Sequence, residues 1–267
     1  MVYEDIIYTK ESGVAYITIN RPETMNAMRM KTLDEMIDAF EDATDDLSVG
    51  VVVLTGAGHK AFCTGGDLGE MNEGNAKEWV YKTNRLLLRL TVLIRNMPKP
   101  VIAAVNGACV GGGNELNILC DLAICVDHAR FSQGEVKIGA VPLWAASQLL
   151  PRIVGEKKAR EIIFLARLLT AQEAEQLGLV NKVVAADLLH DEVHKWCLEI
   201  LSMSPQALRL SKTALNFESD NLWPAFNWGM TSIGLGWGSD ELMEGINSFK
   251  QKRKPDFNKF RSESTST

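Results

Sequence analysis

The segment Val101-Ile102-Ala103-Ala104-Val105, followed closely by Gly111-Gly112-Gly113-Asn114-Glu115, decides the architecture of this chain. Five consecutive apolar residues are typical of a strand that is buried on both faces. The three glycines predict a tight turn, because glycine lets a backbone bend sharply and approach a ligand closely. Asn114–Leu119 continues as a helix, whose first N–H groups are free and carry partial positive charge. The unit can therefore hold a developing oxyanion, although a turn that only packs a helix closely on a sheet would need the same glycines.

A second glycine turn, Gly65-Gly66-Asp67, also follows an apolar strand, Val51–Thr55. The N–H of Gly66 is expected to face that of Gly112, because an oxyanion hole needs two donors from separate turns. For Asp67, capping of a following helix is a better prediction than catalysis.

Two glutamates lie near these turns in the sequence, Glu115 after the glycines and Glu135 in Phe131-Ser132-Gln133-Gly134-Glu135. Taken alone, Glu115 is explained as a first-turn acid that complements the helix dipole, and Glu135 as a solvated loop acid. Two carboxyl groups together can position one water and divide the roles of general acid and general base. Burial can raise the pKa of one of them so that it keeps its proton near neutral pH.

The rest of the pattern predicts an α/β protein. Residues 4–9 and 14–20 alternate as a hairpin around Gly13, and residues 28–40 and 78–97 have helical periodicity. Strands that alternate with helices favour a largely parallel sheet with right-handed connections. Helices then dominate, and the predicted ones are residues 187–203, 205–217, 222–236 and 240–249. We expect a core with the active site in residues 1–184, a helical region in 185–260 and a frayed tail in 261–267.

Composition excludes several classes of protein. The 267 residues carry a net charge of −6, which argues against nucleic acid as a partner, since duplex binding relies on Lys and Arg. The first residues do not have the pattern of a signal peptide, and no membrane span is expected because no apolar run is long enough. Five cysteines without metal-ligand spacing are expected to be reduced thiols of a cytoplasmic protein, and no metal site is expected.

The chain resembles the enoyl-CoA hydratase (crotonase) superfamily, and the agreement runs from about residue 3 to 260. The motifs that carry the resemblance are Asn20-Arg21-Pro22, Met25-Asn26-Ala27, Phe62-Cys63-Thr64-Gly65-Gly66-Asp67, Lys99–Gly107, Gly111–Glu115, Phe131–Glu135, Thr170–Ala174, Gly178-Leu179-Val180 and Lys252–Phe257. The resemblance implies a spiral core of ββα repeats, trimerisation through C-terminal helices and a dimer of trimers.

The same resemblance implies an acyl-CoA thioester as substrate. Backbone N–H groups of Gly66 and Gly112 would hold the thioester oxygen, and Glu115 and Glu135 would be the acid/base pair. No cofactor is implied, because coenzyme A is part of the substrate. The residues expected to contact substrate or its coenzyme A are Met25, Asn26, Ala27, Gly65, Asp67, Leu68, Leu143, Trp144, Lys252 and Lys259. For the two lysines, a solvated helix end is an equal alternative.

The segment after Glu135 departs from the family. Many hydratases have a glycine-rich turn where this chain reads Pro142-Leu143-Trp144-Ala145-Ala146-Ser147. Trp144 and Leu143 add bulk, which favours a flat ring in an acyl pocket. The alternative is that Trp144 packs between helices or against a neighbouring subunit.

Other stretches are similar to the branch of dihydroxynaphthoyl-CoA synthase and 2-ketocyclohexanecarboxyl-CoA hydrolase, but the Asp and Tyr typical of that branch are missing from residues 139–145. We therefore expect a hydro-lyase that hydrates an enoyl-CoA, with a cyclic enoyl-CoA as one candidate substrate. The alternatives are a ring-opening hydrolase or carbon–carbon bond enzyme on a cyclic β-keto acyl-CoA, an isomerase, and a binding scaffold without activity. Product analysis separates them, because hydration adds one water and leaves a ring intact.

Overall fold

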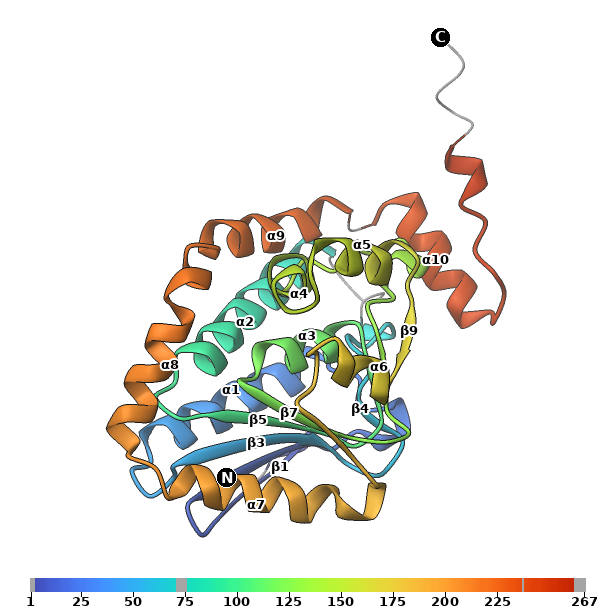
Figure 1. Cartoon of the computed structure of the whole chain (residues 1–267). Coiled ribbons are helices and arrows are strands. Elements are labelled where there is room, and N and C mark those ends of the chain that lie inside the picture. Colours follow the sequence, from blue (N-terminus) through green and yellow to red (C-terminus); the bar gives the residue numbers. More distant parts are fainter. Residues whose placement is uncertain (1–2, 71–75, 237, 262–267) are drawn as a thin grey trace.

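The computed structural model describes residues 3–70, 76–236 and 238–261 (Figure 1). Its larger sheet has the strand order β1-β2-β3-β5-β7-β10. β1 and β2 form the predicted antiparallel hairpin, and every other neighbouring pair is parallel. The strands are β1 (Ile6–Glu11), β2 (Val14–Ile19), β3 (Val51–Gly56), β5 (Val101–Val105), β7 (Leu122–Val126) and β10 (Lys182–Val184).

A second, smaller sheet has the order β4-β6-β8-β9. Its first three strands are parallel, and β9 pairs antiparallel with β8. Each strand has three residues: β4 (Ala61–Cys63), β6 (Ala108–Val110), β8 (Arg130–Ser132) and β9 (Leu168–Thr170). The sequence predicted one largely parallel sheet and did not separate this second one.

The chain passes repeatedly from the larger sheet to the smaller sheet and then into a helix. β3, β4 and α2 form one such unit, and β5, β6 and α3 form the next. β7 and β8 follow in the same way and lead through η3 to α4. This confirms the spiral of ββα repeats.

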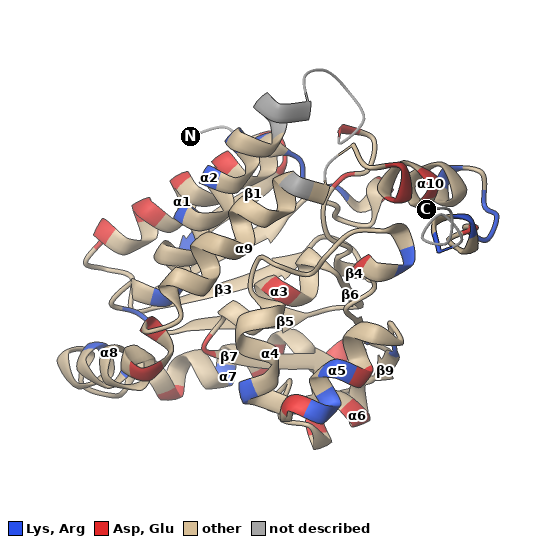
Figure 2. Ribbon diagram, turned by 90° about the horizontal axis from the view of Figure 1, so that it is seen from above, with Lys and Arg blue, Asp and Glu red and all other residues tan. Residues whose placement is uncertain are grey.

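Helices surround the two sheets (Figure 1). They are α1 (Met30–Asp45), α2 (Ala76–Asn96), α3 (Gly112–Leu119), α4 (Ala146–Val154), α5 (Glu156–Phe164), α6 (Ala171–Gln176), α7 (Leu189–Leu201), α8 (Pro205–Asp220), α9 (Trp223–Gly236) and α10 (Asp240–Lys250), with the 3-10 turns η1 (Pro22–Thr24), η3 (Glu135–Ile138), η4 (Ala186–Leu188) and η5 (Asn258–Phe260). α3 is short and its side chains are almost all buried. Figure 2 shows that Lys, Arg, Asp and Glu gather on the outer helices, whereas the strands at the centre are nearly free of them.

The four helices predicted after residue 184 are present, but they differ in position. α7 lies along the larger sheet, where Leu189, Val193 and Cys197 join the core (Figure 1). α8 and α9 cover the side of α2, and α10 projects from the body. Trp237 and the tail residues 262–267 lie outside the described residues. Among the helices that the structure describes, none is long and apolar enough to cross a membrane.

Candidate active site

The two predicted glycine turns touch each other through their backbones. We call residues 64–67 the Gly66 turn and residues 110–113 the Gly112 turn. A Cβ added to Gly65 would lie 3.1 Å from Gly112 N, and one added to Gly112 would lie 3.4 Å from Gly65 Cα. Gly65 has φ +93°, a conformation that side chains disfavour. Glycine at these positions therefore lets two turns from different sheet-to-helix units meet.

The Gly66 turn is paired with Met28 in a way that orients the N–H of Gly66. Met28 N donates to Gly65 O at 2.7 Å, and Asp67 N donates to Met28 O at 2.8 Å. Because backbone groups alternate in direction along an extended segment, the Gly66 N–H points away from Met28. Among the described residues, neither Gly66 N nor Gly112 N, at the first turn of α3, donates a backbone hydrogen bond. The site thus has two free donors from adjoining turns, as an oxyanion hole requires.

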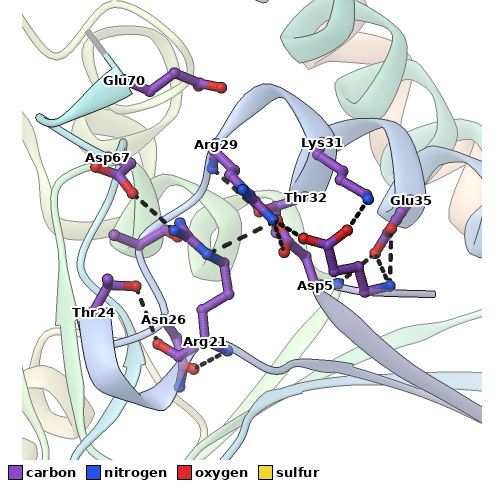
Figure 3. Close-up of polar contacts among 12 residues, drawn as sticks. Asp5, Arg21, Thr24, Asn26, Arg29, Lys31, Thr32, Glu35, Asp67 and Glu70 are labelled. Carbon is purple, nitrogen blue, oxygen red and sulfur yellow. Dashed lines mark hydrogen bonds and ion pairs between the residues drawn. The ribbon is translucent and has the colours of Figure 1, made fainter. Parts of the chain in front are cut away.

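An ion-pair network fixes the Gly66 turn from outside (Figure 3). Arg21 Nη2 lies 3.0 Å from Asp67 Oδ2, and Arg21 Nη1 donates to Ala27 O at 2.6 Å. Asp67 Oδ1 also accepts from Gly69 N at 2.8 Å. The capping of a helix by Asp67 stays a prediction. Glu70 Oε2 accepts from Met30 N at 2.9 Å. Residues 21–30 and 66–70 are therefore held together at several points.

Asp5, which immediately precedes β1, anchors this network, and nothing in the sequence predicted this role. Its carboxylate is buried and accepts two bonds of 2.7 Å from Arg29 and one of 2.6 Å from Thr32, and Arg21 Nε lies 3.8 Å away. Burial alone would raise the pKa of Asp5, but the hydrogen bonds from Arg29 and Thr32 hold it below its ordinary value. Asp5 is thus a buried anion that orients two arginines.

Two thiols lie under the turns. Cys63 and Cys109 are Cα partners on β4 and β6, and both are fully buried. Gly65 N donates to Cys63 Sγ at 3.4 Å, and Cys109 Sγ donates to Gly113 O at 3.4 Å. Burial raises the pKa of both thiols, so they stay protonated at neutral pH.

Glu115 is buried in α3 and binds the N-terminus of another helix. Its Oε1 accepts from Ala145 N at 2.9 Å and from Ala146 N at 3.0 Å, where α4 begins. Ala145 itself provides no side-chain cap, so Glu115 takes that place. Burial raises the pKa of Glu115 to about 7, against the opposing effect of these backbone N–H groups. The helix N-terminus thus favours the carboxylate in a site where burial disfavours it.

Glu135 begins η3 and lies beside the Gly112 turn. A Cβ on Gly111 would be 3.3 Å from Glu135 Oε1, and that oxygen accepts from Gln133 Nε2 at 2.9 Å. The other oxygen, Oε2, is buried and has no hydrogen-bond partner among the described residues. Burial, followed by the negative charge of Glu115, raises the pKa of Glu135 to about 8. The structure therefore brings the two predicted glutamates into electrostatic contact, and of the two only Glu115 is bound at the N-terminus of a helix.

The loop predicted to contact coenzyme A is built around Asn26. Met25 and Asn26 both have φ +57°, and the Asn26 amide donates to Ala57 O at 3.0 Å and to Ala61 O at 2.7 Å. Asn26 is fully buried, so it holds the loop against β4, while Met25 and Leu68 remain half-buried nearby. Contact of this loop with substrate stays a prediction.

The remaining predicted residues lie in two places. Leu143 and Trp144 precede α4; Leu143 is half-buried and Trp144 is buried, with its indole N–H donated to α2. Lys252 is exposed after α10, and Lys259 Nζ lies 3.2 Å from Glu244 Oε2. A role of these residues in binding the acyl group or coenzyme A stays a prediction.

Sequence reasoning gave no role in the site to three residues that shape it, namely Asp5, Arg21 and Gln133. Gln133 is fully buried, donates to Glu135 and Gly111 O, and accepts from Asn114 Nδ2 at 2.7 Å. Its place two residues before Glu135 was the available signal. Arg21 was noted only as part of the motif Asn20-Arg21-Pro22 that carries the family resemblance. Among the described residues, no group of three His, Cys, Asp or Glu could hold a metal ion.

Comparisons with known proteins show which family and which solved structures the chain resembles. The family described as enoyl-CoA hydratase/isomerase matches residues 9–260. An enoyl-CoA hydratase from Mycobacterium avium subsp. paratuberculosis K-10 is 31% identical, with a TM-score of 0.87 over 96% of this chain and 99% of that one. An enoyl-CoA hydratase from Bacillus anthracis is 31% identical (TM-score 0.78, 94% and 98% covered), as is a carnitinyl-CoA dehydratase from Mycobacterium avium 104 (TM-score 0.81, 94% and 97% covered).

Proposed function

The chain belongs to the enoyl-CoA hydratase/isomerase (crotonase) superfamily, and within it we propose that this protein is a hydratase, a lyase that adds water across the α,β double bond of an acyl-CoA. The observation that carries the proposal is the pair of buried glutamates with different surroundings beside two free N–H donors. A double-bond shift needs only one group to move a proton, whereas hydration benefits from a separate acid and base.

The surroundings of the two carboxyl groups suggest their roles. Glu115, held by two N–H groups at the start of α4, is the better carboxylate and acts as general base toward water. Glu135, whose Oε2 is buried without a hydrogen-bond partner among the described residues and whose pKa is raised by burial, is the acid. The water oxygen bonds to Cβ while Glu115 takes its proton, and Glu135 gives its proton to Cα. The thioester oxygen becomes negative during the step and is held by Gly66 N–H and Gly112 N–H.

The finer features of the substrate are proposed from the surrounding residues. Met25–Ala27 and the Gly66 turn, including Gly65, Asp67 and Leu68, would contact coenzyme A, with Lys252 and Lys259 near its phosphates. Leu143 and Trp144 would border the acyl group, and a cyclic enoyl-CoA remains one candidate. No further cofactor is needed for this chemistry.

A homo-oligomer, a trimer or a dimer of trimers, is proposed as the working form. The supporting observation is a set of exposed apolar side chains on the C-terminal helices, which a solitary chain would leave in water. They include Leu210, Leu215 and Phe217 on α8 and Trp228 on α9. The five cysteines are free and mostly buried, which fits the reducing cytoplasm.

The test is mass spectrometry of products from crotonyl-CoA, cyclohexenecarbonyl-CoA, cyclohexadienecarbonyl-CoA and 2-ketocyclohexanecarbonyl-CoA. A reversible gain of one water on any of the enoyl esters supports the hydratase, and the best of them identifies a linear or cyclic acyl group. An open-chain dicarboxylic product from the keto ester alone would refute hydration and favour the ring-opening alternative. A shifted double bond without added water would identify an isomerase.

A further inference from the structure

Residues 143–146 form a short segment that controls the surroundings of Glu115; we call it the Trp144 segment. It supplies the two N–H groups, of Ala145 and Ala146, that bind Glu115 Oε1. Ala145 has φ −142° and ψ −27°, so the chain changes direction here to start α4. The direction of these two N–H groups therefore depends on what holds the segment.

The side chain of Trp144 ties the segment to α2. Its indole is 3% exposed, and Nε1 donates to Thr91 Oγ1 at 2.7 Å and to Leu87 O at 3.2 Å. Thr91 is fully buried, and its own hydroxyl donates to Leu87 O at 2.8 Å. A buried indole needs a partner for its N–H, and this one is fixed by two acceptors on a long helix.

α9 holds the segment from another side. A Cβ on Gly229 would lie 2.6 Å from Leu143 O, so the helix backbone approaches the segment closely. Gln148 Nε2 bridges Leu143 O and Ala225 O, both at 3.3 Å. The Trp144 segment is therefore clamped between α2 and α9, and its freedom to turn the two N–H groups away from Glu115 is small.

We propose that Trp144 and Thr91 are positioning residues of the active site, which aim the α4 N-terminus at Glu115 and so keep this glutamate ionised as the general base. The inference rests on the proposed function for its kinetic consequence. This positioning role does not require either side chain to contact the substrate. Trp144 acts through the backbone of the residues that follow it, and Thr91 acts through Trp144.

The electrostatic consequence has a definite sign. The N–H groups of Ala145 and Ala146 stabilise the carboxylate of Glu115, so weakening them raises its pKa. The ionisable group that interacts with Glu115 is Glu135. Among the described residues, no hydrogen bond joins Glu135 to the Trp144 indole. A change at Trp144 should therefore act directly on the titration of Glu115, and on that of Glu135 only through the charge of Glu115.

The experiment compares pH profiles of kcat/KM for wild type, Trp144→Phe and Thr91→Val. Trp144→Phe removes both indole hydrogen bonds, and Thr91→Val removes only the shorter one, to Thr91 Oγ1. Thr91→Ser keeps a hydroxyl group as the acceptor. Trp196→Phe is the matched control, because Trp196 Nε1 donates to Glu192 Oε1 at 2.8 Å on α7. We expect the acid limb to move upward by about half a unit to one unit in Trp144→Phe and Thr91→Val, the effect of losing roughly one hydrogen bond. The profiles of Thr91→Ser and Trp196→Phe should stay near that of wild type.

A carbon NMR titration of labelled glutamate side chains, with Glu115 assigned from Glu115→Gln, measures the same pKa without any substrate. It separates the two proposals: absence of hydration by wild type refutes the function, and an unchanged Glu115 titration in Trp144→Phe and Thr91→Val refutes the positioning role. A shift that Trp196→Phe shares, or that Thr91→Ser fails to reverse, also refutes it. If thermal unfolding shows that Trp144→Phe is unstable, the comparison of Thr91→Val with Thr91→Ser tests the positioning role.

Discussion

The two sides of the candidate active site are held by opposite kinds of chemistry. Charged groups fix the Gly66 turn, where Arg21 joins Asp67 to the buried anion Asp5. Neutral N–H groups of Ala145 and Ala146 fix Glu115 on the other side. A full positive charge beside Glu115 would lower its pKa strongly, whereas backbone dipoles lower it only partly. The comparison teaches that ion pairs serve where a turn must be rigid, and dipoles where a carboxyl group must still exchange a proton.

Removing the acid/base groups on the neutral side should give the largest effect. Glu115→Gln and Glu135→Gln keep the shape of the side chain but cannot accept or donate the proton, so kcat for hydration should fall by about 10²–10⁴-fold. Steady-state kinetics measure the loss, and calorimetry with a saturated acyl-CoA should show nearly unchanged affinity. Wild-type turnover in the double variant would contradict the assignment.

The charged side should affect stability more than proton transfer. Asp5→Asn removes a buried anion and leaves Arg21 and Arg29 without their shared partner, so the free energy of unfolding should fall by about 3 kcal/mol. Urea unfolding measures this loss. Because the pKa of Asp5 is lower when folded, its contribution is present above the unfolded pKa and disappears as acid protonates the folded carboxylate. Equal acid sensitivity of wild type and Asp5→Asn would show that this anion is not the group responsible.

The glutamate pair should show the opposite dependence on pH. Its members have raised pKa values when folded, so the native state binds more protons and loses stability as pH rises from the ordinary glutamate range to about 8. Glu135→Gln removes one of these buried charges and should be more stable than wild type in weakly alkaline buffer, by on the order of 1 kcal/mol. Thermal unfolding at several pH values tests the sign, and a variant that is less stable than wild type throughout would overturn it.

The smallest effect is expected at the rim of the charged network. Glu4 pairs with Arg29 and Lys31, but it is mostly exposed and solvent screens the pair. Glu4→Gln should leave the urea midpoint within experimental error of wild type, in contrast to Asp5→Asn beside it. A loss comparable to that of Asp5→Asn would mean that the rim and the buried anion act as one unit.

The parts of the fold with strong periodicity could be predicted from the sequence. Val101–Val105 is a buried strand at its predicted bounds, and the helices after residue 184 lie within a few residues of their predicted ends. The smaller sheet was missed because strands of three residues, such as Ala61–Cys63, have no recognisable alternation. Its existence depends on tertiary pairing of segments far apart in the chain.

The site was predictable where a residue type has few uses. Glycine turns and paired carboxyl groups pointed to Gly66, Gly112, Glu115 and Glu135. The partnership of Asp5 with Arg21 and Arg29 could not be predicted, because the two arginines lie 16 and 24 positions after Asp5 and have no local reason to contact it. For Trp144, bulk alone did not distinguish an acyl pocket from a helix contact, since only the structure identifies the acceptor of its N–H.

The buried thiols beneath the two turns can report how often the site opens. Cys63 and Cys109 are fully buried against Gly65 and Gly113, so a reagent can reach them only when the turns separate from the strands below. Their labelling rate in the native protein therefore reports how often the oxyanion site comes apart, without an introduced probe. A bound thioester that bridges the two turns should lower the labelling rate of both thiols.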